Sequence, residues 1–169
     1  MMTRDQKTMI IILMGVSGSG KTVIGRLLAE RLGWTFYDAD DFHPASNIEK
    51  MSQNQPLTDA DRLPWLERLQ QLVRTTLDSG SNAVLACSAL KQEYRRYLLI
   101  DPRVRLVYLK GSFLLIQGRL SHRRGHFMPA ALLESQFKAL EEPTDAVTVD
   151  VSGTPDEIIG QIIEELSVR

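Results

Sequence analysis

One stretch, residues 15–22, constrains the chain more than any other, because its sequence GVSGSGKT fits the pattern G-x-x-x-x-G-K-[ST] of a phosphate-binding loop. An unbroken apolar run at 9–14 precedes it, as in a strand buried on both faces of a parallel sheet. Apolar residues at helical spacing follow at 23–32. A Gly- and Ser-rich turn before an ordinary helix is the alternative, but the full pattern between a strand and a helix favours the loop. We therefore expect the chain to bind a nucleotide.

The chemistry of such a loop follows from its backbone. Glycines let the chain curl so that its N–H groups point inward, and the start of the next helix adds positive potential. Lys21 can then reach the β- and γ-phosphates and act in catalysis, and the hydroxyl of Thr22 can bind Mg²⁺. The loop residues that we predict to contact the nucleotide are Gly15, Ser17, Gly18, Ser19, Gly20, Lys21 and Thr22.

Size and composition describe one domain over residues 1–169, with 43% hydrophobic and 24% charged residues, as in ordinary soluble proteins. The formal net charge of −1 argues against a nucleic-acid or membrane-surface partner, which usually requires a basic surplus. The only cysteine, Cys87, excludes an internal disulfide and fits a reducing compartment. The polar residues 1–8 and the short apolar run after them do not resemble a signal peptide or a membrane span. We therefore expect a cytoplasmic protein.

Strand and helix patterns alternate along the whole chain. The expected strands are 9–14, 34–38, 83–87, 104–109 and 146–151. Helices are expected at 23–32, 44–51, 92–99, 112–120 and 129–140, with a last helix that begins after Thr154. A longer helix begins after a cap at Thr58 or Asp61, and its apolar stripe is Leu63, Leu66, Leu69, Val73 and Leu77. This order predicts a three-layer α/β domain with a parallel five-stranded sheet.

Several classes of nucleotide-binding protein use a phosphate-binding loop, and other features must select among them. A GTP switch needs an N-K-x-D segment, and the sequence has none. A motor ATPase needs an acidic residue at the end of a neighbouring strand, but the third expected strand ends in Cys87-Ser88. The second expected strand ends instead in the acidic run 38–41, at the sheet edge where ligands bind. With the basic segment 121–127, this layout favours phosphoryl transfer to a small alcohol.

Four blocks of sequence, 38–51, 56–66, 87–95 and 126–143, resemble the gluconate kinase family and follow one another in that family's order. With the loop, the resemblance extends from residue 9 to about residue 150. It implies the nucleoside-monophosphate-kinase-like P-loop fold, shared by shikimate kinases, with a small lid at about 119–128. Asn54 stands where the family would have glycine, but Asn tolerates left-handed backbone angles.

The resemblance also implies an activity. Members of the family transfer phosphate from ATP to the 6-hydroxyl of D-gluconate, giving 6-phospho-D-gluconate and ADP, with Mg²⁺. They commonly form homodimers. A nucleotide-binding regulator without catalysis is the competing hypothesis, but such a sensor has no need of an acidic pocket beside the loop.

Three aspartates follow the second expected strand, and each has an expected role. Asp40 is the candidate for the catalytic carboxylate that binds the attacking hydroxyl and accepts its proton. Asp38, nearer the strand, is expected to order water around Mg²⁺, which makes it a candidate metal residue with Thr22. The alternative for any of the three is that it only caps the next turn, and Asp41 is the preferred candidate for that role.

Gluconate requires a cation for its carboxylate and polar groups for its hydroxyls. Arg62 and Lys91 are the candidates for the carboxylate, and His43 and Ser88 for the hydroxyls. The alternatives are that Arg62 only pairs with Asp59, that Lys91 is a solvated helix start and that His43 fills a polar turn.

Arginines of the expected lid are candidates to contact the transferring phosphate. We predict that Arg119 and Arg123 bind the nucleotide and that Arg123 stabilises the transferring group, as arginine fingers do. The alternative is a solvated basic helix end. The loop at 151–155 is the expected adenine contact, by analogy with related kinases. Trp65 and Cys87 are expected to pack in the core.

Overall fold

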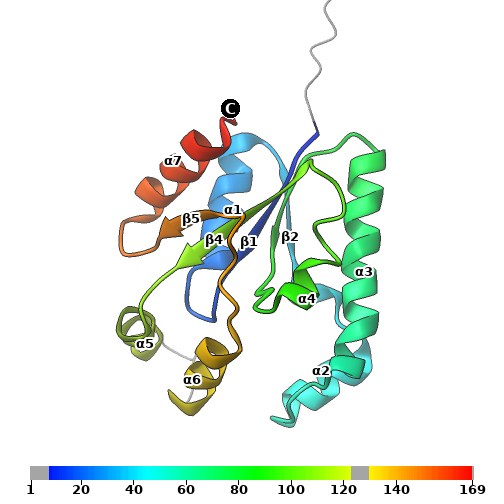
Figure 1. Ribbon diagram of the computed structural model, residues 1–169, viewed down its shortest axis with the longest axis vertical. Helices are drawn as coiled ribbons and strands as arrows, with labels where there is room; N and C mark the ends of the chain where they lie inside the picture. Colours follow the sequence, from blue (N-terminus) through cyan, green and yellow to red (C-terminus); the bar gives the residue numbers. More distant parts are fainter. Residues whose placement is uncertain (1–7, 123–129, 169) are drawn as a thin grey trace, which may run out of the picture.

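A five-stranded sheet forms the centre of the computed structural model, which describes residues 8–122 and 130–168 (Figure 1). All of its strands are parallel, in the order β2-β3-β1-β4-β5. The strands are β1 (Ile10–Met14), β2 (Thr35–Asp38), β3 (Ala83–Ala86), β4 (Val104–Lys110) and β5 (Val147–Asp150). Each lies where the sequence predicts it, with ends that differ by one residue at most. The predicted parallel five-stranded sheet is confirmed.

Helices cover both faces of this sheet and complete the three layers (Figure 1). They are α1 (Lys21–Leu32), α2 (Ala45–Ser52), α3 (Asp59–Asp78), α4 (Gln92–Arg95), α5 (Phe113–Ser121), α6 (Ala130–Ala139) and α7 (Pro155–Leu166), with a 3₁₀-helix η1 at Ala39–Phe42. The α1 and α7 helices pack on one face, and α3 and α4 pack on the other. None of the helices in the described parts of the chain combines the length and apolar character needed to cross a bilayer.

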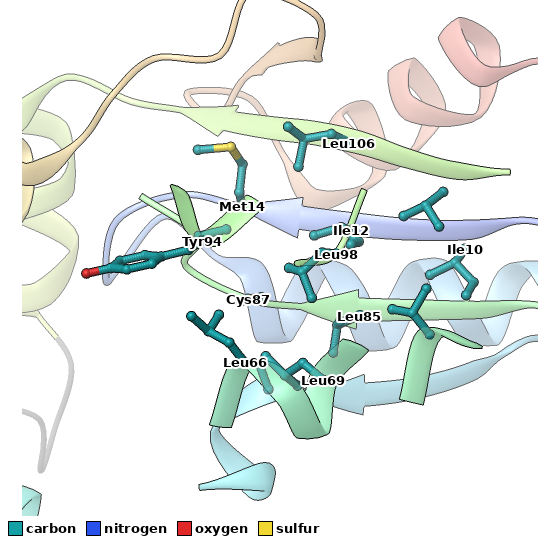
Figure 2. Close-up of a cluster of buried hydrophobic side chains, with 14 of the residues drawn as sticks. Ile10, Ile12, Met14, Leu66, Leu69, Leu85, Cys87, Tyr94, Leu98 and Leu106 are labelled. Carbon is teal, nitrogen blue, oxygen red and sulfur yellow. The ribbon is translucent and has the colours of Figure 1, made fainter. Parts of the chain in front are cut away.

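The central strand β1 is buried along its whole length. Because side chains alternate across a sheet, Ile10, Ile12 and Met14 enter the core layer beneath α3 and α4. Ile11 and Leu13 enter the opposite layer beneath α1 and α7. Figure 2 shows the first layer, where side chains of α3 meet those of β1 and β3. Two covered faces explain why the run before the phosphate loop is apolar throughout.

The long helix α3 begins after Thr58, which resolves the choice between Thr58 and Asp61. Both residues take part in a capping box, because Thr58 Oγ1 accepts the N–H of Asp61 and the Asp61 carboxylate accepts the N–H of Thr58. The predicted apolar stripe is wrong at Leu63, which is 41% exposed. Helical spacing puts Leu63 on one flank of the stripe, whereas Trp65 on the other flank faces the core and is buried.

The helix predicted at 92–99 is shorter than expected, since α4 ends at Arg95. Residues 96–98 continue as turns, in which the N–H groups of Leu98 and Leu99 both reach the Arg95 carbonyl. The N–H of Tyr97 donates to the carbonyl of Tyr94, three residues back, so the α-helical hydrogen-bond pattern ends here and tighter turns follow. The carbonyl of Tyr97 accepts a hydrogen bond from Gln70 Nε2, which joins these turns to α3.

Candidate active site

The carboxyl ends of β1, β2 and β3 meet at one edge of the sheet. The register pairs Leu13 and Asp38 with the same residue of β3, Ala86, so the segments that follow these strands leave the sheet side by side. The N–H of Gly15 donates to the carbonyl of Ser88 across 3.3 Å, which ties the phosphate loop to the segment after β3. The sequence-predicted residues on these three segments are therefore neighbours.

The loop at 15–20 has the backbone of an anion site. Gly18 and Gly20 have φ of 84° and 97°, which side chains other than hydrogen rarely allow. A Cβ atom on Gly15 would lie 2.9 Å from the Leu109 carbonyl oxygen, so the chain there passes too close to β4 for any side chain. Ser19 Oγ is buried and has no hydrogen-bond partner among the described residues. Together these features fit a site whose polar partner is a phosphate.

Lys21 and Thr22 begin α1 directly after the loop. Lys21 Nζ lies 2.9 Å from the carbonyl oxygen of Gly15 and 3.0 Å from that of Val16, so the ammonium folds back over the loop. Thr22 Oγ1 lies 3.3 Å from Asp38 Oδ2, which brings the two predicted Mg²⁺ residues together. No group of three or more His, Cys, Asp or Glu ligands occurs in 8–122 and 130–168. Mg²⁺ at a phosphate site needs few protein oxygens, because phosphates and water supply the others.

The acidic run after β2 forms the 3₁₀-helix η1. Asp38 Oδ1 accepts the N–H of Asp40 across 3.0 Å, so Asp38 caps this turn and the expectation that Asp41 would do so is wrong. The surrounding protein removes part of the hydration of the Asp40 carboxyl and so raises its pKa, and the negative charge of Asp38 acts in the same direction. Electrostatic interactions with Lys21 and with the ring of His43 oppose this rise in pKa. Asp40 therefore lies within electrostatic reach of the loop lysine.

His43 is buried and held from two sides. Its ring stacks on Trp65 with centroids 4.4 Å apart and planes 11° apart, and its Nδ1 lies 3.2 Å from Asn47 Nδ2. Because the same Asn47 nitrogen also donates to the Asp61 carbonyl, it is a donor, and Nδ1 of His43 accepts. Burial lowers the pKa of His43, and the charge of Arg62 lowers it further, while Asp40 opposes the shift. The His43 ring is therefore neutral, with its proton on Nε2.

Trp65 is packed as predicted, but it also positions the acidic segment. Its indole Nε1 donates to the carbonyl of Ala39, between Asp38 and Asp40, across 2.7 Å. Asn47 was not among the predicted site residues. It lies four residues after His43, across the start of α2, and no local motif marks it, because the role of its amide depends on α3.

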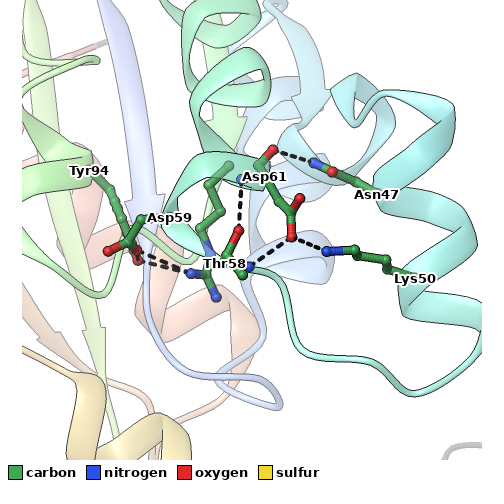
Figure 3. A network of polar contacts seen from close by, with 7 residues as sticks. Asn47, Lys50, Thr58, Asp59, Asp61 and Tyr94 are labelled. Carbon is green, nitrogen blue, oxygen red and sulfur yellow. Dashed lines mark hydrogen bonds and ion pairs between the residues drawn. The ribbon is translucent and has the colours of Figure 1, made fainter.

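Two cations gather on the ring of Tyr94. The Arg62 guanidinium carbon lies 5.4 Å and the Lys91 ammonium 5.8 Å from its centroid. Arg62 Nη1 lies 3.1 Å from the Tyr94 hydroxyl, which in turn donates to Asp59 Oδ1 across 2.9 Å (Figure 3). The Arg62–Asp59 pair considered from the sequence also exists, at 3.5 Å, but Asp59 shares it with Tyr94. This cation cluster, Arg62, Lys91 and Tyr94, offers two positive charges to an anion.

A cavity of about 680 Å³ lies on the α5 side of the loop. Its walls include Gly18 and Gly20 of the loop, Arg119 of α5, and Gly153 and Pro155 of the segment after β5. The Arg119 guanidinium donates to the carbonyl of Val151, at the start of that segment. The cavity thus joins the loop to the segment at 151–155 predicted to contact adenine. Arg123 and the lid residues 123–128 lie outside the described residues.

A phosphate loop between β1 and α1, beside an acidic segment after β2, on a parallel sheet of order 2-3-1-4-5, defines a P-loop kinase fold. A solved shikimate kinase from Aquifex aeolicus shares this fold, with a TM-score of 0.61 at 19% identity, and covers 94% of this chain and 96% of its own. The sequence model of the shikimate kinase family matches residues 17–167.

Relatives with higher sequence identity show which family within this fold class the chain resembles. A probable gluconokinase of Xenopus tropicalis is 45% identical over 94% of this chain and 93% of its own length. A gluconokinase of Gluconobacter oxydans is 46% identical over 96% and 94%. The crystal structure of a gluconokinase from Sinorhizobium meliloti has a TM-score of 0.84 at 41% identity and covers 94% of this chain and 91% of that one. The chain therefore belongs to the gluconokinase family.

Proposed function

We propose that the protein transfers the γ-phosphoryl group of ATP to the 6-hydroxyl of D-gluconate and releases 6-phospho-D-gluconate and ADP. The observation that carries the proposal is the environment of His43, whose electrostatic partners include both Asp40 and Arg62. An acid and a cation that both act on the His43 ring suit a chain-like substrate with a hydroxyl at one end and a carboxylate at the other. Membership of the gluconokinase family supports the same substrate.

The phosphate loop and the adjoining cavity bind ATP in this proposal. The N–H groups of the loop and of the first turn of α1 hold the phosphates, and Lys21 neutralises their charge. The base occupies the cavity next to Arg119, whose guanidinium is anchored on Val151. Arg119 and Arg123 contact the phosphates, and Arg123 stabilises the transferring group from a lid at about 119–128 of a single domain, 1–169.

Mg²⁺ fits the oxygen pair formed by Thr22 and Asp38, whose atoms lie 3.3 Å apart. Thr22 would bind the ion directly, and Asp38 would order water around it. When bound, Mg²⁺ neutralises charge on the β- and γ-phosphates.

Asp40 orients the 6-hydroxyl and accepts its proton. A raised pKa makes this carboxylate a stronger base than an ordinary aspartate. Phosphoryl transfer depends more on alignment and charge neutralisation than on covalent assistance, so the position of Asp40 near Lys21 matters as much as its basicity.

Gluconate lies between this acid and the cation cluster. Arg62 and Lys91 bind its carboxylate, with Arg62 fixed by the Tyr94 hydroxyl. His43 donates its Nε2 proton to a substrate hydroxyl, because Nδ1 already accepts from Asn47. Ser88 contacts another hydroxyl of gluconate. The carbonyl of Ser88 accepts the N–H of Gly15, which holds this segment beside the phosphate loop.

We further propose a cytoplasmic homodimer without nucleic-acid or membrane partners. The balanced charge of −1 and the single, free Cys87 support the cytoplasmic part of this proposal, and the homodimer rests on the family resemblance.

A coupled assay with Mg²⁺ and ATP tests the reaction against a panel of sugar acids, polyols and shikimate. We expect ADP release only with gluconate at low concentration, and phosphorus NMR should show one phosphate monoester at the 6-position. Turnover of shikimate without turnover of gluconate would contradict the substrate. ATP binding without turnover of any acceptor would favour the regulator instead.

A further inference from the structure

One side chain of α6 forms hydrogen bonds with Ser17, one of the phosphate-loop residues predicted from the sequence to contact the nucleotide. Gln136 Oε1 accepts the N–H of Ser17 across 2.7 Å, and Gln136 Nε2 donates to Ser17 Oγ across 3.0 Å. The two residues are 119 positions apart in the sequence. This pair, Gln136–Ser17, engages the N–H and the hydroxyl of the loop residue just before Gly18.

The helix that carries Gln136 is itself firmly seated. Leu133, on the turn before it, is buried in a third apolar cluster with Val16 of the loop and Ile116 of α5. Phe137 packs edge-on against Phe113 of α5, with centroids 5.6 Å apart. The Gln136 amide therefore extends from a packed support and does not follow the loop passively.

The chain after α6 reaches the acceptor side of the site as well. The N–H of Glu141 donates to the Leu90 carbonyl across 2.8 Å. The guanidinium of Arg95, which is buried, binds the carbonyls of Ala89, Leu90 and Glu141. One short stretch, 136–141, thus contacts both the phosphate loop and the segment between Ser88 and Lys91.

A loop with three glycines has many backbone states, and only some of them present its N–H groups to a phosphate. The measured affinity for a nucleotide falls in proportion to the fraction of molecules that hold the competent state. We propose that Gln136 is a positioning residue for nucleotide binding, which fixes Ser17 and thereby keeps the amides from Gly18 onward in the competent arrangement. The inference rests on the assignment of this loop to ATP in the proposed function.

Gln136→Met tests the role, because Met has a similar length but makes neither hydrogen bond. With each of the two bonds contributing about 1 kcal/mol, we expect the Kd for Mg²⁺–ADP, measured by calorimetry without a sugar acid, to rise about 30-fold. The KM for ATP should rise by a similar factor, and the KM for gluconate should stay the same. Ser135→Met, at an exposed position of the same helix, is the matched control and should leave all three values unchanged.

A double-mutant cycle with Ser17→Ala separates positioning from general damage to the fold. Ser17→Ala removes the hydroxyl bond and keeps the N–H bond, so Gln136→Met should raise the ADP Kd by a smaller factor in that background than in the wild type. Equal factors in both backgrounds, or an unchanged Kd in folded Gln136→Met, would overturn the proposal. Because ADP binding is measured without an acceptor, failure of gluconate turnover in the wild-type protein would contradict the proposed function alone.

Discussion

The carboxyl group of Asp40 lies among charges of both signs. Lost hydration and the neighbouring Asp38 disfavour its ionised form, whereas His43 and Lys21 favour it. The net effect is a raised pKa, so this group binds a proton more readily than an exposed aspartate does. Its environment suits proton acceptance better than a purely structural role.

Asp40→Asn keeps the shape of the side chain and removes the base. We expect kcat for gluconate phosphorylation to fall by a factor of about 10²–10⁴, because general bases contribute by that order. The Kd for Mg²⁺–ADP should not rise, since removal of a negative charge near Lys21 does not weaken phosphate binding. Steady-state kinetics and calorimetry measure the two quantities, and a variant with wild-type kcat would show that another group accepts the proton.

The substitution Tyr94→Phe tests the role of the cation cluster in binding gluconate. The ring that Arg62 and Lys91 approach remains, but the hydroxyl that joins Arg62 to Asp59 is lost. We expect the KM for gluconate to rise about 5- to 10-fold, as for the loss of one or two hydrogen bonds that position a charged group, and the KM for ATP to stay the same. Initial-rate measurements with each substrate varied in turn would distinguish this from a rise in both constants, which would contradict a role limited to the acceptor.

Helices α2 and α3 are joined at the start of α3 by one carboxylate. Asp61 lies 2.7 Å from Lys50 of α2 and also closes the capping box with Thr58 (Figure 3). The hydrogen bond from Lys50, with those from Thr58, lowers the pKa of Asp61 to about 2. The carboxylate that links the two helices therefore remains ionised through mildly acidic pH.

Stability should depend on pH at this junction. Since the pKa of Asp61 in the folded state is below its ordinary value of 3.8, its contribution is complete above pH 4 and is lost as the pH falls towards about 2. The free energy of unfolding of Asp61→Asn should therefore lie below that of the wild type at pH 7 and 5, and the two should converge near pH 2. Urea titrations at several pH values check this, and a difference that is the same at all pH values would contradict the assigned role of the charge.

Local pattern sufficed for most elements but failed where a distant partner decides the outcome. The buried run of β1 and the left-handed angle at Asn54, with φ of 56°, agree with what the residues themselves allow. The tighter turns after Arg95, and their hydrogen bond from Gln70 of α3, are features that periodicity does not detect.

The same limit applies to the candidate site. The residues with a motif or a strand-end position, such as Lys21 and Asp38, were identified from the sequence. Asn47, Tyr94 and Gln136 were not, because their roles come from hydrogen bonds to segments that only the folded chain brings near. Spacing along the chain carries no signal for such pairs.

At the scale of the whole molecule, the rate at which a reagent labels Cys87 measures how often the core around the sheet opens. Its thiol is buried at the end of β3, and burial raises its pKa to about 12, so the folded protein presents no thiolate to a reagent. We expect an aromatic disulfide reagent to label the native protein at least about 10³-fold more slowly than the unfolded chain, in line with opening of the core. Labelling rates measured by absorbance at increasing urea concentrations test this. Fast labelling without urea would mean that the structure opens locally at the carboxyl end of β3.

The outermost position of β2 has a consequence for how the protein would fail on warming. This strand pairs only with β3 and is half-buried, whereas β1 is enclosed on every side. Fraying should therefore begin at the two edge strands, β2 with the acid and β5 with the segment predicted to contact adenine, and reach the glycine loop at the centre later. During a slow temperature ramp, catalysis would therefore cease while the buried strands around β1 are still folded.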